Sequence, residues 1–261
     1  MASTLISQRE DRTLVLTISD PATRNTLSPQ VYAAALEALE SAEGDPEVRC
    51  VVLRGDGDHF CAGGDLNRLA RTREQGAEVA AENVERFHTL VEALRSHPKP
   101  VIAAVEGFAA GGGCSLALAC DLIVASESAR FVMSYGRAGL SSDGGGLWQL
   151  MHALPRAQAL KFLWLPEPQS ARDWLAAGLV AQVTDTGHAL PEALRLAGRL
   201  AAMAPNALAS VKELANDAPS RSLRQHLDGE REHFVRNLLH PNAGEGVQAF
   251  FDKRAPRFGD V

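Results

Sequence analysis

Long hydrophobic runs are missing from this sequence of 261 residues. No stretch reaches the roughly 18 apolar residues that mark a candidate membrane-spanning helix. Residues 1–16, MASTLISQREDRTLVL, also lack the basic segment and following apolar segment of a secretory signal peptide. We therefore expect no signal peptide and no membrane partner.

Cysteine is scarce, and the four cysteines stand apart from one another without a CxxC pair or a zinc-type spacing with histidine. Disulfide frameworks are typical of short secreted chains, which this chain does not resemble in length. We expect four buried free thiols, no metal ion and a location in the reducing cytoplasm. The four residues are Cys50, Cys61, Cys114 and Cys120.

The chain also has no excess of positive charge, since it contains 26 basic and 32 acidic residues and has a formal net charge of −6. The sequence pI is about 5.8. Proteins that bind nucleic acid as their main partner carry a basic patch or stripe. We therefore do not expect nucleic acid to be a partner.

Three common glycine motifs are absent. GFAAGGGC (107–114) follows a predicted strand but does not have the GxGxxG spacing of dinucleotide-binding folds, and no GxxxxGK[ST] phosphate loop is present. GCSLA (113–117) lacks the last glycine of a GxSxG nucleophile elbow. Dinucleotide, P-loop and serine-hydrolase chemistry are therefore not indicated.

What the chain does contain is an alternation of strands and helices. RTLVLTI (12–18), VRCVVLRG (48–55) and VIAAVEG (101–107) are typical of strands. Between the first two, a helix is predicted up to Gly44, with Ser28 as N-cap and Pro29 at its first position. A second helix is predicted at 78–96. This order indicates an α/β class.

From about residue 190 onward, helical periodicity continues without strand-type runs. We therefore divide the chain into an α/β core over residues 1–195 and a helical domain over residues 196–261. No linker of low complexity separates the two parts.

Glycine clusters follow the predicted strands at FCAGGDL (60–66) and EGFAAGGGCSLALA (106–119). The amide of Gly112 falls in the first turn of a predicted helix, where N–H groups lack partners and the helix dipole favours negative charge. Two such donors aimed at one point would form an oxyanion hole. Close packing of strand and helix explains the glycines equally well, so composition alone leaves both interpretations open.

A third cluster, GLSSDGGG (139–146), places a single carboxylate, Asp143, between two serines and three glycines. Three adjacent glycines indicate a sharp bend or a close approach of another group. Asp143 is therefore either a turn residue or the acid–base group of an active site.

Four blocks together resemble the enoyl-CoA hydratase/isomerase (crotonase) family, and the similarity runs from about residue 10 to the C-terminus. The blocks are HFCAGGDLNRL, KPVIAAVEGFAAGGGCSLALACDLIVASESARF, GLSSDGGGLWQL and ARDWLAAGLVAQV. The resemblance implies a spiral of ββα units followed by a C-terminal helical trimerisation domain. It also implies acyl-CoA substrates, no metal or redox cofactor, and a homotrimer or homohexamer.

The resemblance assigns roles to residues by position. The amides of Gly64 and Gly112 match the two donors that hold the thioester oxygen in this family. Other positions match regions that line the coenzyme A site or the acyl pocket. These are Arg24, Asn25, Ala62, Gly63, Asp65, Leu66 and Tyr135.

The chain departs from the family's hydratases at both of their catalytic glutamates. Ser115 stands at one position and Tyr135 at the other. A tyrosine hydroxyl with a pKa of about 10 cannot replace a carboxylate as a base for water at neutral pH. Asp143 remains as the single carboxylate, at a position where dienoyl-CoA isomerases of the family carry an aspartate that shuttles a proton.

The pattern around Asp143 is particularly similar to 1,2-epoxyphenylacetyl-CoA isomerase-like members, which act in phenylacetate degradation. We therefore expect an acyl-CoA isomerase with Asp143 as proton shuttle, and Tyr135 either donates a hydrogen bond to the acyl group or shapes the pocket. Three alternatives stay open: a hydratase-type lyase, an aryl-CoA dehalogenase with Asp143 as nucleophile, and a non-catalytic acyl-CoA-binding subunit.

Overall fold

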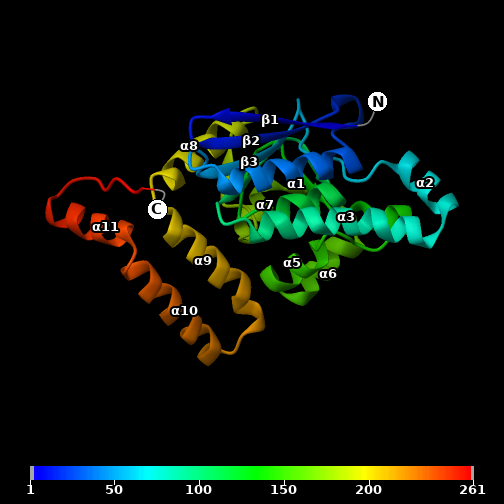
Figure 1. The fold of residues 1–261 in the computed structure, drawn as a ribbon. Helices are drawn as coiled ribbons and strands as arrows, with labels where there is room; N and C mark the ends of the chain where they lie inside the picture. The colour runs from blue at the N-terminus through cyan, green and yellow to red at the C-terminus, as the bar shows by residue number, and fades with distance from the viewer. Residues whose placement is uncertain (1–2, 260–261) are drawn as a thin grey trace.

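A six-stranded sheet forms the centre of the computed structural model, which describes residues 3–259 (Figure 1). Its strand order is β1-β2-β3-β4-β6-β9, with β1 and β2 antiparallel and every later neighbour parallel. The strands are β1 (Thr4–Glu10), β2 (Thr13–Ser19), β3 (Cys50–Gly55), β4 (Val101–Val105), β6 (Leu122–Ser126) and β9 (Gln182–Thr184).

A second sheet of three short strands has the order β5-β7-β8. These strands are β5 (Phe108–Ala110), β7 (Arg130–Val132) and β8 (Gln169–Ser170). From β4 onward the chain passes back and forth between the two sheets: β4, β6 and β9 join the large sheet, and β5, β7 and β8 join the small one. This is the expected crotonase-type spiral, and the predicted α/β fold class is confirmed.

The described residues form eleven α-helices. They are α1 (Pro29–Gly44), α2 (Leu66–Gln75), α3 (Ala77–Ser96), α4 (Gly112–Ala119), α5 (Gly146–Ala153), α6 (Arg156–Trp164), α7 (Ala171–Ala176), α8 (Ala189–Ala201), α9 (Pro205–Asp217), α10 (Leu223–Leu238) and α11 (Pro241–Phe251). Three 3₁₀ turns join them, η1 (Pro21–Thr23), η2 (Ser134–Ala138) and η3 (Ala218–Ser220).

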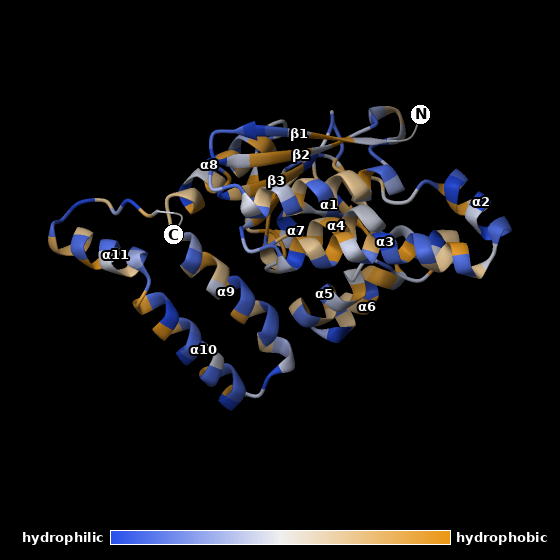
Figure 2. Ribbon diagram, in the orientation of Figure 1, coloured by the Kyte–Doolittle hydropathy of each residue, from blue (hydrophilic) through white to orange (hydrophobic). Residues whose placement is uncertain are grey.

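The central strands β3, β4 and β6 of the large sheet are buried on both faces, and alternate residues of each strand point to opposite sides. On β3, Val51 and Leu53 join the main core with α1, α3 and α4, whereas Val52 packs with α8. The contact with α8 uses Ala193 and Ala197, whose small side chains let the helix lie close to the sheet. In Figure 2 orange is prominent on β2 and β3, whereas much of β1 is blue, and α2, which stands out from the body, is mostly blue.

The predicted elements are confirmed where their local signals were strong. The helix α1 begins after Ser28, whose side chain accepts a hydrogen bond from the Val31 N–H, and ends at Gly44. The predicted strands correspond to β2, β3 and β4, and the helix predicted at 78–96 is α3. Strand β1 was not predicted from the sequence, because its polar residues are mostly exposed and it forms by pairing with β2.

Helix α8 contains residue 195, where the sequence predicted a domain boundary, and it packs on the sheet. The first helix to leave the body is α9, and α10 and α11 extend away from it (Figure 1). Within residues 3–259, no helix is both long and apolar enough to cross a membrane.

Candidate active site

The segment after β3 is hydrogen bonded to β5, the first strand of the small sheet. The Cys61 N–H donates to the Phe108 carbonyl at 3.0 Å, and the Ala110 N–H donates back to the Cys61 carbonyl at 2.9 Å. On its other side, the Leu27 N–H donates to the Gly63 carbonyl at 2.8 Å. Three parts of the chain that are distant in sequence thus meet at residues 61–64.

Gly63 is required by this junction. Its φ of +86° lies in the region that favours glycine, and a Cβ there would lie 2.6 Å from the Ala110 carbonyl oxygen and 2.9 Å from the Gly112 nitrogen. Both close contacts belong to main-chain atoms, which cannot move aside as the tip of a side chain would. The segment that holds Gly64 therefore lies directly against the start of α4.

The N–H groups of Gly64 and Gly112 are the two predicted donors. Neither donates a hydrogen bond to any residue within 3–259. Gly112 is the first residue of α4, where the N–H has no partner inside the helix. The structure thus brings two unpaired main-chain donors onto adjoining segments.

Asn25 holds the loop that leads into residues 61–64. Its side chain is fully buried, and its Nδ2 donates to the carbonyls of Asp56 at 2.9 Å and His59 at 2.7 Å. Its Oδ1 accepts from the Asp20 N–H at 2.9 Å. Both amide hydrogens are used, so the Asn25 side chain has no donor for coenzyme A and instead positions the loop before Phe60.

The remaining predicted binding residues differ in how they are used. The Arg24 carbonyl accepts from the Ala62 N–H at 2.9 Å, while the Arg24 residue is exposed. Asp65 is the N-cap of α2, and its carboxylate accepts from the Asn67 N–H at 2.9 Å. Leu66 is 67% exposed at the start of that helix. Within residues 3–259, none of these residues is hydrogen bonded to Asp143.

Asp143 lies between η2 and α5 and is partly buried. The Tyr135 hydroxyl donates to its Oδ1 at 2.6 Å. The Ser115 hydroxyl donates to the Asp143 carbonyl at 2.9 Å and lies 3.1 Å from the Tyr135 hydroxyl. The two positions where the family resemblance called for glutamates therefore carry hydroxyls that both contact Asp143.

The glycines after Asp143 let α5 start close to α3 and α4. A Cβ at Gly144 would lie 2.2 Å from the Phe87 ring, and its φ is +59°. A Cβ at Gly146 would lie 2.5 Å from the Ser115 hydroxyl. The same Phe87 ring lies 3.5 Å from the Cβ position of Gly112, so the loop of Asp143 and the free donor of α4 share one neighbour.

Burial and the neighbouring Asp143 charge raise the pKa of Tyr135 above its ordinary value, so this phenol stays protonated at neutral pH. Burial also raises the pKa of Tyr32 to about 12, against the lowering effect of Arg68. Tyr135 was predicted to serve the acyl group or the pocket, and the structure places its hydroxyl on Asp143. No local sequence signal pointed to this contact.

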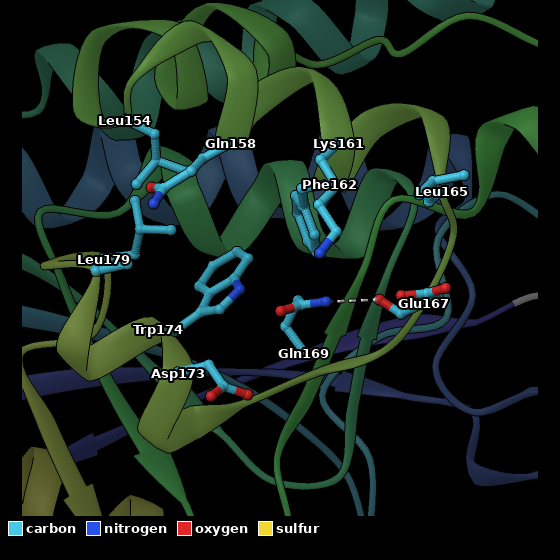
Figure 3. Close-up of a pocket in the computed structure, with 11 residues that line it drawn as sticks. Leu154, Gln158, Lys161, Phe162, Leu165, Glu167, Gln169, Asp173, Trp174 and Leu179 are labelled. Atoms are coloured by element: carbon cyan, nitrogen blue, oxygen red, sulfur yellow. Dashed lines mark hydrogen bonds between the residues drawn. The ribbon is translucent and has the colours of Figure 1, made fainter.

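A separate pocket lies between α6, α7 and β8 (Figure 3). The Trp174 ring at its floor stacks on Phe131 with centroids 3.9 Å apart, and Gln169 donates to the Glu167 carbonyl at 3.4 Å. None of the predicted site residues lines it. No group of three or more His, Cys, Asp or Glu side chains in residues 3–259 is arranged to hold a metal ion.

Comparisons with known proteins agree on the family. The family model described as enoyl-CoA hydratase/isomerase matches residues 8–261. The chain is 36% identical to the 1,2-epoxyphenylacetyl-CoA isomerase of Escherichia coli K12, covering 99% of both chains. It is 34% identical to the 2,3-dehydroadipyl-CoA hydratase of the same organism, covering 98% of both.

Among solved structures, an enoyl-CoA hydratase from Polaromonas sp. JS666 is 54% identical, with a TM-score of 0.97 and coverage of 98% of this chain and 99% of the other. A hydratase from Bacillus anthracis, at 26% identity, still has a TM-score of 0.94. The resemblance seen in the glycine-rich blocks therefore extends over the whole chain. The chain belongs to the enoyl-CoA hydratase/isomerase family.

Proposed function

We propose that this chain is an acyl-CoA isomerase that shifts a double bond, or rearranges an epoxide or oxepin, with Asp143 as its proton shuttle. The observation that carries the proposal is the single carboxylate at the centre of the site, flanked by Ser115 and Tyr135 in place of two further carboxylates. One carboxylate suffices when a single group both removes a proton and returns one.

In the proposed reaction the thioester oxygen lies between the N–H groups of Gly64 and Gly112. Asp143 removes a proton from a carbon conjugated with the thioester, and the electron pair of that C–H bond moves toward the thioester oxygen. The two donors stabilise the resulting enolate. The protonated Asp143 then returns the proton to another carbon of the conjugated chain, and the carboxylate is restored.

The relatives support the substrate class without deciding the reaction, since their names include both isomerases and hydratases. The isomerase that is 36% identical acts, by its name, on 1,2-epoxyphenylacetyl-CoA. We infer that an acyl-CoA of this kind, as in phenylacetate degradation, is the substrate class to test first.

The test is to screen the full-length protein against a panel of enoyl- and aryl-acyl-CoA thioesters in deuterated water. We expect deuterium at the α or γ carbon of product or recovered substrate. Asp143→Asn should lower this exchange at least roughly 100-fold, the range for loss of a general base. Asp185→Asn, a change at an exposed loop aspartate, is the matched control. Full exchange activity in Asp143→Asn would overturn the proposal.

A hydratase is the second candidate, because the solved structure that is 54% identical is described as an enoyl-CoA hydratase. Asp143 alone would then activate water. Reaction in ¹⁸O-labelled water separates the two: hydration incorporates ¹⁸O into the acyl chain, whereas isomerisation of a double bond does not.

The proposal includes no metal or redox cofactor, since coenzyme A is part of the substrate. The four free, buried cysteines are compatible with a reducing compartment, and we propose the cytoplasm. We also propose a homotrimer or homohexamer. Exposed apolar side chains on α10 and α11, among them Phe234 and Phe250, support this assembly.

A further inference from the structure

Three oxygen atoms lie close together at Asp143. The Tyr135 hydroxyl oxygen is 2.6 Å from Asp143 Oδ1, and the Ser115 hydroxyl oxygen is 3.1 Å from the Tyr135 hydroxyl oxygen. An ionised carboxylate is an acceptor only, so the single hydrogen of Tyr135 points to Oδ1. Bonds of a hydroxyl to a charged group are short and strong compared with neutral ones. The Tyr135 hydrogen is therefore committed to Asp143.

Ser115 fixes the main chain of the same residue. Its hydroxyl donates to the Asp143 carbonyl at 2.9 Å, and Ser115 itself is fully buried on α4. Ser115 lies one turn after Gly112 on this helix. The element that carries one free main-chain donor thus also fixes the distance from that donor to Asp143.

We propose that Tyr135 is a positioning residue for Asp143: it occupies Oδ1 and leaves Oδ2 as the oxygen that faces a substrate proton, while Ser115 holds the backbone of Asp143. This inference rests on the proposed function of Asp143 as the proton shuttle. The tyrosine acts through the carboxylate and need not touch the substrate.

A second tyrosine lies near this carboxylate. Tyr32 of α1 interacts electrostatically with Asp143 and with Arg68 of α2, whose Nη2 donates to the Leu27 carbonyl at 3.2 Å. The Tyr32 hydroxyl is not hydrogen bonded to Asp143 in the described structure, and its ring is buried in a stack on Phe87. Tyr32 is therefore the matched control, because it is the second of only two tyrosines in the chain.

The first test is Tyr135→Phe, which removes the hydroxyl and keeps the ring. We expect kcat for proton exchange to fall roughly 10- to 100-fold, the effect of losing one hydrogen bond to a charged group. KM should change little. Tyr32→Phe should leave kcat nearly unchanged.

A second test does not depend on activity. In protein labelled with 3-fluorotyrosine, ¹⁹F NMR should give two signals, which Tyr32→Phe and Tyr135→Phe assign. Asp143→Asn should shift the Tyr135 signal and leave the Tyr32 signal nearly unchanged. If Asp143→Asn left the Tyr135 signal unchanged, the hydrogen bond between Tyr135 and Asp143 would be absent in solution, and the inference would be overturned.

The tests separate this inference from the proposed function. Activity that survives Asp143→Asn defeats the proton-shuttle proposal itself. Activity that requires Asp143 but keeps its kcat in Tyr135→Phe defeats only the positioning role. Circular dichroism and the melting temperature of Tyr135→Phe confirm that the variant is folded.

Discussion

At the scale of single residues, the position of Asp143 depends on glycines that no other residue can replace. Gly144 has a φ of +59°, and an added Cβ would lie 2.2 Å from the Phe87 ring. Phe87 is buried in the main core and cannot move away freely. A side chain at residue 144 must therefore displace either the ring or the loop that carries Asp143.

We predict that Gly144→Ala lowers stability by roughly 2–4 kcal/mol, from overpacking together with backbone strain. Exchange activity should fall at least about tenfold, because small displacements of a catalytic group are costly. Gly178→Ala is the matched control, since Gly178 has a φ of +77° but nothing within 4 Å of the added Cβ. Urea unfolding and the exchange assay measure both effects. Equal losses in the two variants would contradict the role of the Phe87 contact.

The residues of the site were predictable from the sequence only in part. Asp143 and the amide of Gly112 could be named because glycine clusters and a helix start are local patterns. The contact of Tyr135 and Ser115 with Asp143 could not, because it joins residues 8 and 28 positions apart through folding of three elements. Asn25 shows the same limit, since only the fold reveals that its amide is fully used inside the protein.

At the scale of elements, those with strong local sequence signals were predicted correctly, whereas those specified by their tertiary partners were not. Ser28 and Pro29 mark the start of α1 by capping chemistry that acts within one turn. In β1 the side chains are mostly exposed and polar, so the strand is specified by its partner β2. The predicted division at residue 195 falls within α8 because a row of alanines places that helix on the sheet.

Helix α9 is held to the body by polar contacts. Lys212 Nζ lies 2.8 Å from Asp121 Oδ2 and donates to the Leu94 carbonyl at 3.0 Å. Burial raises the pKa of Asp121 above its ordinary value, and the Lys212 charge acts in the opposite direction. A carboxyl whose folded pKa is raised takes away stability as the pH rises from its unfolded pKa toward its folded pKa.

We predict that in Lys212→Met the loss of stability from ionising Asp121 continues to higher pH. Without the Lys212 charge, nothing from this lysine opposes the rise in the Asp121 pKa that burial causes. The variant should lose roughly 1–3 kcal/mol at about pH 7.5, a value below that of a fully buried pair because the Asp121 side chain is 26% exposed. The loss should be smaller at about pH 4.5. Urea unfolding at a fixed protein concentration measures both. Adding Asp121→Asn to Lys212→Met should restore much of the stability lost at pH 7.5. A loss of stability that is the same at both pH values would show that the Asp121 charge is not its cause.

At the scale of the whole molecule, the C-terminal helices expose more apolar surface than a monomer needs. Phe250 is 80% exposed and Phe251 is 72% exposed on α11, while Leu239 is 80% exposed at the end of α10. In Figure 2, orange residues are interspersed along α10 and α11, which extend from the body. Apolar patches of this kind mark protein interfaces, and the proposed trimer or hexamer would cover them.

We predict that this chain of 261 residues and 27.9 kDa sediments as a species of about 84 kDa or about 167 kDa, corresponding to three or six copies. Phe250→Ser together with Phe251→Ser should shift it toward smaller species at micromolar concentration, because two large apolar side chains leave the interface. Trp164→Ser, a change at a similarly exposed aromatic residue on α6, should leave the mass unchanged. A monomeric wild-type chain, or equal effects of the two changes, would show that α11 does not form the interface.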